Sequence, residues 1–471
     1  MTWLPCRSKK YTLLCTAQLK LKQNKVTEIT MAHRVSKLLA ATGAVLTCIS
    51  IPSYAAVNGL TEQDEFNIKL RSIYFDRDYD NDASDDSTFA QGIELNYTSG
   101  YINDLVSVGV STYTVMDINS TGSAAGNILP AGNESGGVDD SFSKFGQYFL
   151  DFKLGNNGHV KVGGQKTKSM LLKSSGSRAI PNTFRGVFGD YKIGNTKLYG
   201  YVYDKWSRRH DDRWEDFSTD QSATGAISVI WGVGATHKKD NLILEAEYLN
   251  SHNYLSKIGL KISYDIKLEQ SKLTLSTGIF TSQDDGDLFV TGAEGGDLDD
   301  EDTSGALTGL TKSENDGFAY YLDADWKKDI WSVGAAFTKV SDAWIEDNFS
   351  GDHGTNPFPT RSLIGADLTN QNETSWQARL GIDLKAVSPG LTTKFYYTDG
   401  SDAENSALGK LGGTADEKYW AVDTRYKVEK IKGLSLRWLF VDYTTEKSGS
   451  VDGVKGDRAD HRVYVDYTIK F

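Results

Sequence analysis

The sequence predicts an all-β fold, a transmembrane antiparallel up-and-down β-barrel of about 18 strands. Three observations predict it. From Phe66 onward, segments of roughly ten residues alternate apolar and polar side chains, as strands with one lipid-facing side do. The chain holds 24 Tyr and 10 Trp, residue types favoured at membrane interfaces. The final segment, from His461, alternates up to a C-terminal Phe471.

The alternating segments have the period of two that identifies a strand with one apolar face. Clear examples are 66–71, 93–97, 106–110 and 148–154. Short breaks predict tight turns, as at 155–158 and 388–390, and long breaks predict loops, near 117–143, 167–183, 284–315 and 346–372. Short turns at one end of a barrel and long loops at the other are typical of barrels in the outer membrane.

The N-terminal region has the organisation of an export signal that begins at Met31 rather than at residue 1. A basic start with Arg34 and Lys37 precedes an apolar run, and Ser53-Tyr54-Ala55 forms a small-x-small cleavage site. We therefore expect an over-extended start at 1–30, a signal peptide at 31–55 and a barrel at 56–471. At roughly 23 residues for a strand and its connection, the barrel segment accommodates about 16 to 18 strands.

Cysteine and charge usage narrow the class of protein further. All three cysteines, Cys6, Cys15 and Cys48, precede the expected cut, so the exported part is no disulfide scaffold. Of 51 Lys and Arg and 63 Asp and Glu, eight basic residues and one acidic residue also precede it. The exported part then has 43 basic and 62 acidic residues, a net charge of −19, which argues against nucleic acid as a partner.

Motifs for catalysis or metal binding are sparse. We find no nucleophile elbow and no metal-spaced histidine pair, so we expect neither an enzyme nor a bound cofactor or metal. The acidic run at 297–302 offers carboxylate oxygens to calcium but lacks the spacing of a calcium loop, and we interpret it as a solvated loop. Tyr199, Tyr201, Tyr203 and Trp206 fit either a stacking track for sugars or a membrane-interface belt.

A stripe of basic residues is predicted on one side of the lumen by the last five strands. In each, the apolar face fixes the register, because a slip of one residue would turn the whole apolar set inward. The residues then placed inside are Arg379, Lys394, Arg425, Arg437 and Arg462. Cations along a pore attract anions and repel other cations. The alternative is an ordinary polar lining, since Asp383, Asp423 and Asp466 also point inward and could pair with these cations.

Four groups of residues resemble the OprD-type substrate-specific porins, a family with small-carboxylate, amino-acid and chitoporin branches. They are the RSIYFDRDY run at 71–79 with Gln91 and Gly92, SRAIPNTFRG at 177–186, SWQAR at 375–379 followed by PGL at 389–391, and KGLSLR at 432–437. The resemblance covers nearly the whole exported part. It implies 18 strands and a third external loop that folds inward to form the constriction.

The resemblance also implies roles for individual residues. Ser177, Arg178, Pro181 and Arg185 would lie on the constriction loop, with Arg178 as the candidate eyelet residue. Arg379, Lys394, Arg425 and Arg437 look like rungs of the family's ladder of basic wall residues. Lys394 stands where an arginine is expected, and an ammonium group cannot offer a planar bidentate fork to a carboxylate.

Together these observations predict a passive diffusion channel of the Gram-negative outer membrane for small polar nutrients, with small carboxylates, amino acids or peptides as the expected cargo. The alternatives are a porin for oligosaccharides such as chitin fragments, and a non-conducting structural or adhesive barrel. Expected partners are solutes, outer-membrane lipid, and the assembly machinery through the strand that ends in Phe471. We expect a monomer or a weak trimer.

Overall fold

The computed structural model describes residues 60–79, 85–121, 128–130, 141–219, 227–292, 300–301, 307–308, 315–341, 344–352, 355–364, 367–404, 414–445 and 457–471. The expected over-extended start and signal peptide lie outside these residues, as does most of the acidic run at 297–302. No helix in the described part of the chain is long and apolar enough to cross a membrane.

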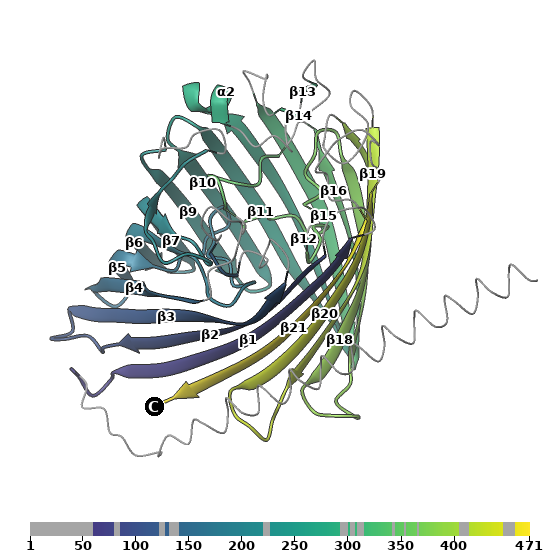
Figure 1. Cartoon of the computed structure of the whole chain (residues 1–471). Helices are drawn as coiled ribbons and strands as arrows, with labels where there is room; N and C mark the ends of the chain where they lie inside the picture. Colours follow the sequence, from purple (N-terminus) through teal and green to yellow (C-terminus); the bar gives the residue numbers. More distant parts are fainter. Residues whose placement is uncertain are drawn as a thin grey trace, which may run out of the picture. The chain divides into compact units, whose positions relative to one another are not determined.

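The described chain is almost entirely β-structure (Figure 1). The strands that form the ring are β1 (Glu65–Tyr79), β2 (Asp86–Thr98), β3 (Val106–Thr121), β4 (Ser141–Leu154), β5 (Gly158–Gln165), β6 (Thr183–Ile193), β7 (Thr196–Ser207), β9 (Ile230–Lys239), β10 (Leu242–Ser251), β11 (Leu255–Leu268), β12 (Ser271–Asp284), β15 (Asp316–Lys328), β16 (Trp331–Val340), β17 (Thr374–Asp383), β18 (Leu391–Glu404), β19 (Thr414–Lys427), β20 (Leu434–Thr445) and β21 (Arg458–Lys470). The connections contain α2 (Asp287–Gly292) and the two-residue strands β8 (Glu215–Asp216), β13 (Asp300–Glu301) and β14 (Leu307–Thr308).

The ring closes through antiparallel pairing of its first and last strands. In that pair Ile68 lies opposite Ile469 and Tyr74 lies opposite Val463. Figure 1 shows β1 in purple beside β21 in yellow. Each ring strand pairs with the next along the chain, so the backbone groups of the wall satisfy one another without a free edge. The predicted antiparallel barrel of about 18 strands is confirmed.

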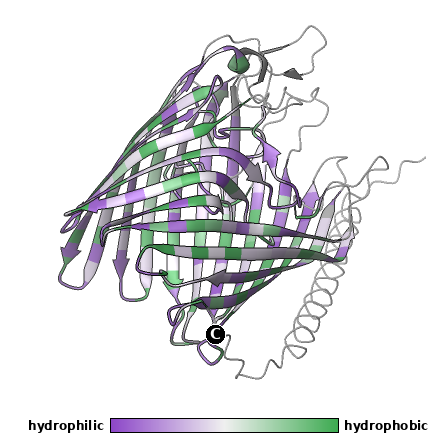
Figure 2. Ribbon diagram, turned by 90° about the vertical axis from the view of Figure 1, so that its left-hand side faces the viewer, coloured by the Kyte–Doolittle hydropathy of each residue, from purple (hydrophilic) through white to green (hydrophobic). Residues whose placement is uncertain are grey.

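Side chains alternate between the two faces of the wall. Trp376, Phe395, Trp420 and Trp438 are each between 39% and 47% exposed and point outward. The residues that follow three of them, Gln377, Ala421 and Leu439, are at most 2% exposed. Figure 2 shows this alternation as green and purple blocks along the strands. An outward apolar face suits contact with lipid, and an inward polar face suits contact with water.

The two ends of the ring carry connections of different lengths. At one end two-residue turns join consecutive strands, and Gly194 and Asp240 adopt the left-handed conformation that such tight turns require. At the other end the connections are longer, and they include the β5–β6 loop (166–182), the β7–β9 loop (208–229) and the β16–β17 loop (341–373). In outer-membrane barrels the long-loop end faces the outside of the cell.

Gly92 of β2 brings the β5–β6 loop against the inner wall. A Cβ atom at this position would lie 2.3 Å from the carbonyl oxygen of Ala179 and 3.2 Å from its Cβ. The neighbours Ala179 and Ile180 are almost fully buried, so the loop is packed on the wall rather than suspended over it. A residue without a side chain is what permits this close approach.

We predict that Gly92→Val detaches this part of the loop while the ring still closes. The added side chain overlaps the loop backbone at Ala179, and overpacking of this kind costs about 1–3 kcal/mol. The loop therefore has to move away from the wall. Hydrogen–deuterium exchange of the 174–182 segment in detergent should become faster than in the wild-type protein. Gly176→Ala is the matched control, because a Cβ there meets nothing within 4 Å. Equal exchange in Gly92→Val and wild type would contradict the prediction.

Candidate functional site

The β5–β6 loop crosses the lumen from one wall to the opposite one. At one wall the Arg71 guanidinium of β1 donates to the carbonyl oxygens of Gly176 (2.6 Å) and Arg178 (3.1 Å). At the other, a carboxylate oxygen of Glu247 on β10 accepts the backbone N–H of Met170 at 2.6 Å. Strands β1 and β10 lie about half the ring apart. The loop therefore narrows the channel, as the family resemblance implied.

The β16–β17 loop also enters the lumen, which the sequence had not indicated. Its Asn348 side-chain amide donates to the carbonyl oxygen of Leu171 in the β5–β6 loop at 2.9 Å. The ammonium group of Lys257 on β11 donates to the carbonyl oxygen of Glu346 at 2.8 Å. On the far side, the Tyr419 hydroxyl of β19 donates to the carbonyl oxygen of Arg361 at 2.7 Å. The constriction is thus built by two loops rather than by the third external loop alone.

An aromatic core holds the inward loops to the wall. The Phe349 ring lies 4.7 Å from the rings of both Trp206 and Phe217. Trp344 and Phe358 pack edge-on against Phe280 of β12, at 5.7 and 5.3 Å. All are almost fully buried. Large aromatic residues inside a long polar break, as at 344, 349 and 358, were the signal that could have identified a buried loop.

Arg379 extends from β17 toward carboxylates of β15. Its guanidinium contacts Asp323 and lies 3.3 Å from Asp325. The strand registers explain the contact, because Arg379 lies opposite Gly334 of β16 and that glycine has no side chain to separate Arg379 from Asp325. Two acidic groups thus surround this cation.

Arg425 and Arg437 share a single carboxylate. They lie directly opposite each other on β19 and β20, and each has a guanidinium nitrogen 2.8 Å from Asp423. Asp423 is almost fully buried, whereas Arg425 stays half-exposed toward the lumen. The two arginines and their shared carboxylate together retain a net positive charge. The sequence prediction that Asp423 could pair with the stripe agrees with this geometry.

Arg462 is more deeply placed than the rest of the stripe. It pairs with Asp460 at 3.0 Å, and Asp460 also accepts from Arg77 at 2.9 Å. The Arg462 guanidinium stacks on the Phe75 ring at 4.1 Å, and Arg178 of the β5–β6 loop lies 5.0 Å from the same ring. Arg462 is only 3% exposed, so it lies buried against Phe75 and Asp460 rather than lining open space.

Lys394 lines a cavity of about 250 Å³ together with Arg361, Arg379 and Tyr396. Among the residues that the structure describes, neither Lys394 nor Arg361 forms an ion pair. Arg361 comes from the β16–β17 loop, and sequence reasoning missed it because its loop was expected outside the lumen. Within the same described ranges Asp383 forms no ion pair either, and Asp466 pairs with Arg71 rather than with the stripe.

The family of the chain follows from comparison with known proteins. The model of the outer membrane porin, OprD family, matches residues 58–471. The chain belongs to the OprD family. It is therefore an outer-membrane porin, a channel class that supports passive diffusion of small solutes.

Relatives of this porin are similar over most of their length. It is 24% identical to the porin-like protein GalP of Pseudomonas putida over 399 residues, which cover 83% of this chain and 89% of GalP. It is also 24% identical to Porin D of Pseudomonas aeruginosa over 449 residues, 89% of this chain and 94% of Porin D. The solved structure of OpdK from Pseudomonas aeruginosa with vanillate is 20% identical, with a TM-score of 0.72, and the match covers 88% of this chain and all of OpdK.

Three of the four residues assigned to the constriction loop of this porin lie on the β5–β6 loop. The backbone carbonyl oxygen of Ser177 accepts a hydrogen bond from the Tyr464 hydroxyl. Arg178 and Pro181 follow in the same loop. Arg185 does not. It lies inside β6 and pairs with Asp204 on the outward side of the wall. The strand begins at Thr183 because pairing with β5 and β7 already starts there, which the sequence motif alone could not indicate.

The aromatic run on β7 serves neither of its two expected roles. Tyr201, Tyr203 and Trp206 are at most 2% exposed, since they face inward and the loops cover them. They therefore form no interface belt and no open stacking track. Tyr199 lines a cavity. Within the described ranges, no three His, Cys, Asp or Glu side chains are arranged to hold a metal ion.

Asp352 gives the packing of the β16–β17 loop a dependence on pH. Burial raises the pKa of its carboxyl from 3.8 to about 6, although the Asn348 amide and the charges of Lys257 and Arg209 oppose this shift. A loop released into water regains the ordinary value. Between pH 3.8 and about 6, Asp352 is protonated in the packed loop but ionised in the released loop. The free energy that favours packing therefore falls as the pH rises toward 6.

We predict that the 344–352 segment of this porin exchanges its amide hydrogens faster above pH 6 than at pH 4.5, after correction for the intrinsic rates. Asp352→Asn should remove that difference, because the amide stays neutral over the whole range. Asp383→Asn, at the short-turn end, should leave the difference as in wild type. A wild-type loop protected equally at both pH values would contradict this account.

We also predict that Asp423→Asn raises the anion preference of the current. The substitution removes the one carboxylate that Arg425 and Arg437 share. The chloride-to-potassium permeability ratio should rise by roughly two- to five-fold, since a unit charge 4 Å from an ion is worth about 1 kcal/mol in water. Reversal potentials in a potassium chloride gradient measure it. Asp399→Asn, which removes a charge from the outward face of β18, is the control, and an equal shift in both variants would refute the assignment.

Proposed function

We propose that this porin admits small anionic solutes, carboxylates foremost, along the basic stripe on its inner wall. The stripe consists of Arg379, Lys394, Arg425, Arg437 and Arg462. The observation that carries the proposal is that Asp423 is shared by two arginines, while Lys394 and Arg361 have no acidic partner among the described residues. The stripe therefore keeps a net positive charge inside an acidic protein.

Pairing with a carboxylate lowers the net charge beside an arginine but also fixes the orientation of its guanidinium. A guanidinium fixed by a buried carboxylate still has N–H donors to offer, and it is already in place when a solute arrives. Arg425, half-exposed beside Asp423, fits that role. Arg379, which is surrounded by Asp323 and Asp325, contributes least to the anion preference.

Solute movement in this proposal is passive and involves no chemical step. A solute enters at the long-loop end, passes between the β5–β6 and β16–β17 loops, and then meets Arg361, Lys394 and the arginines. Small carboxylates and amino acids carry the group that this lining attracts. OpdK, a neighbour with the same fold, was solved with vanillate, which is a carboxylate.

The oligosaccharide alternative has less support from the described residues. Uptake of chitin fragments would use exposed aromatic faces, and the aromatic residues of β7 are mostly covered by the loops. Blockade of the current by chito-oligosaccharides would favour this alternative. A non-conducting structural or adhesive barrel would show no conductance at all.

The proposal also covers how the barrel is assembled and in which oligomeric state it works. The backbone N–H of Phe471 donates to the carbonyl oxygen of Phe66 at 3.0 Å, and the two rings lie 5.2 Å apart. The C-terminal strand thus ends on an outward aromatic residue beside the first strand, available to the outer-membrane assembly machinery while the ring is still open. We propose a monomer or weak trimer as the working state.

We predict that the triple variant Arg379→Gln, Arg425→Gln and Arg437→Gln loses most of its anion preference. Removal of three positive charges from the wall should lower the chloride-to-potassium permeability ratio by roughly ten-fold. Reversal potentials and acetate permeability measure the effect. The matched control is Lys327→Gln, Lys328→Gln and Lys430→Gln, which removes three exposed charges near the short turns. A cation preference that the arginine substitutions leave unchanged would refute the proposal.

A further inference from the structure

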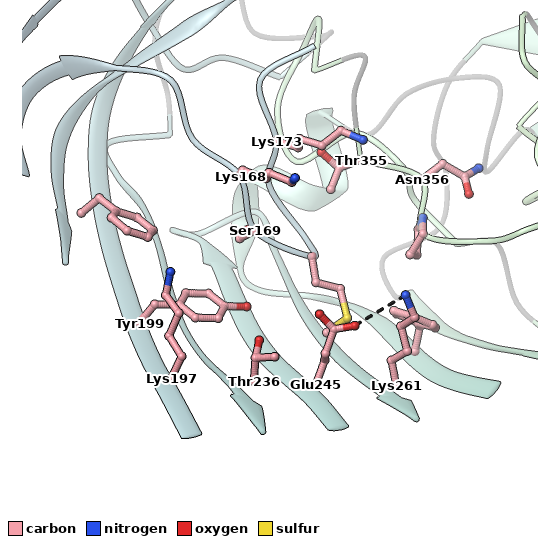
Figure 3. A pocket seen from close by; sticks show the side chains of 14 residues that line it. Lys168, Ser169, Lys173, Lys197, Tyr199, Thr236, Glu245, Lys261, Thr355 and Asn356 are labelled. Atoms are coloured by element: carbon pink, nitrogen blue, oxygen red, sulfur yellow. Dashed lines mark ion pairs between the residues drawn. The ribbon is translucent and has the colours of Figure 1, made fainter. Parts of the chain in front are cut away.

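A second group of cations lines the lumen on the wall opposite the stripe. A cavity of about 290 Å³ lies between the tips of the two inward loops and strands β6 to β12 (Figure 3). Its cationic lining consists of Lys168, Lys173, Lys197 and Lys261, and Glu245 is the one acidic residue that lines it. Its volume is at the lower end of the range for small-molecule sites.

Two of the four lysines have acidic partners and two do not. Lys197 pairs with Asp190 at 2.6 Å, and Lys261 lies 3.5 Å from Glu245, the ion pair drawn in Figure 3. Lys168 and Lys173 face each other across a backbone bridge in the β5–β6 loop. As far as the described residues go, neither forms an ion pair or a side-chain hydrogen bond. The loop thus presents to the cavity two ammonium groups that have no ion-pair partner among the described residues.

The hairpin that carries these two lysines is fixed in place. The Glu247 carboxylate accepts the backbone N–H groups of Met170 and Leu171 at 2.6 and 3.2 Å. The hydroxyls of Tyr199 and Tyr201 donate to the same carboxylate, each at 2.7 Å. The tip is held by two hydrogen bonds to a carboxylate that the two tyrosines keep in place, with Lys168 and Lys173 on the cavity side (Figure 3). The site is therefore formed before any solute arrives.

The remaining lining suits an organic phosphate. Hydroxyls from Ser169, Thr236 and Thr355 and the Asn356 amide line the cavity beside the lysines. The Thr355 hydroxyl is buried without a hydrogen-bond partner among the described residues. On one side the stacked rings of Phe188 and Tyr199, 6.4 Å apart, provide an apolar face for the organic part of a solute.

The charge density at the hairpin favours a compact dianion. Burial and the charges of Arg361 and Lys168 lower the pKa of Lys173, although the charges of Glu346 and Asp352 oppose this shift, so several cations lie near one another at this edge of the constriction. Ammonium groups act as compact point charges and bind phosphate without needing the bidentate geometry through which arginine binds carboxylate or phosphate. None of the residues that line this cavity is an arginine.

We propose that this lysine cavity is a binding station for solutes that carry a phosphate monoester, separate from the arginine stripe. Such a solute places its phosphate between Lys168 and Lys173, with the Thr355 hydroxyl as a further donor, and its organic part against Phe188 and Tyr199. The inference rests on the proposed function only in that solutes reach the lumen.

The test is blockade of single-channel chloride current by inorganic phosphate at pH 7.5, with acetate as a monoanion for comparison. Phosphate should block the wild-type channel at a lower concentration than acetate does. The variant Lys168→Gln with Lys173→Gln should raise the half-blocking phosphate concentration by roughly ten-fold, because it removes two charge-assisted hydrogen bonds. The matched control is Lys238→Gln with Lys239→Gln at the exposed β9–β10 turn. Phosphate should block this variant at the same concentration as it blocks the wild-type channel.

The arginine triple variant separates this inference from the proposed function. Phosphate blockade that persists in it, together with loss of blockade in the lysine variant, supports a separate station even if the stripe carries no anion preference. Phosphate blockade unchanged in the lysine variant, or no stronger than acetate blockade in wild type, overturns the inference. Heat-modifiable migration on a gel checks that each variant has folded, and Lys168→Arg with Lys173→Arg provides a charge-conserving variant should the Gln form fail.

Discussion

Closure of the backbone hydrogen-bond ring is the constraint on which the rest of this structure depends. The pairing of β1 with β21 leaves no strand edge in contact with lipid, where an unpaired peptide group would be costly. Closure also fixes one register for every strand, and with it the face on which each side chain lies. Trp376 and Phe395 point to lipid for the same reason that Arg379 and Lys394 point to water. A slip of one residue in any pair would exchange the two faces, so the lipid-facing band and the lining of the channel are determined together.

A ring of this size cannot be filled by the side chains of its own wall. The β5–β6 and β16–β17 loops solve this by forming a core inside the lumen. Phe349 and Trp344 pack against aromatic residues of the wall, and burial of each such side chain contributes about 1.5–3 kcal/mol. The hydrogen bonds that Glu247 accepts and Lys257 donates then hold the loop backbones in place. The constriction is consequently a packed structure, and its shape follows from contacts between segments that lie far apart in the sequence.

Two kinds of cation occupy two different walls of the channel. On β17 to β21 arginines predominate, and carboxylates such as Asp423 and Asp460 hold them in fixed orientations. On the opposite side lysines surround a partly apolar cavity, and those on the β5–β6 hairpin have no acidic partner among the described residues. Arginine offers a planar fork of donors to an anion, whereas an ammonium group acts as a compact point charge. The division therefore permits one lumen to handle more than one class of anion, at separate positions along the path of a solute.

The sequence by itself determined the barrel and its approximate strand number, because a period of two is a local property of the backbone. It also carried the resemblance that gave the family. Only the tertiary structure decided which charges meet, since Asp323 reaches Arg379 from 56 residues away once the strands have paired. The same holds for the entry of Arg361 into the lumen, for the outward position of Arg185, and for the covering of Tyr201 and Tyr203. These depend on contacts between distant segments, which local alternation does not encode.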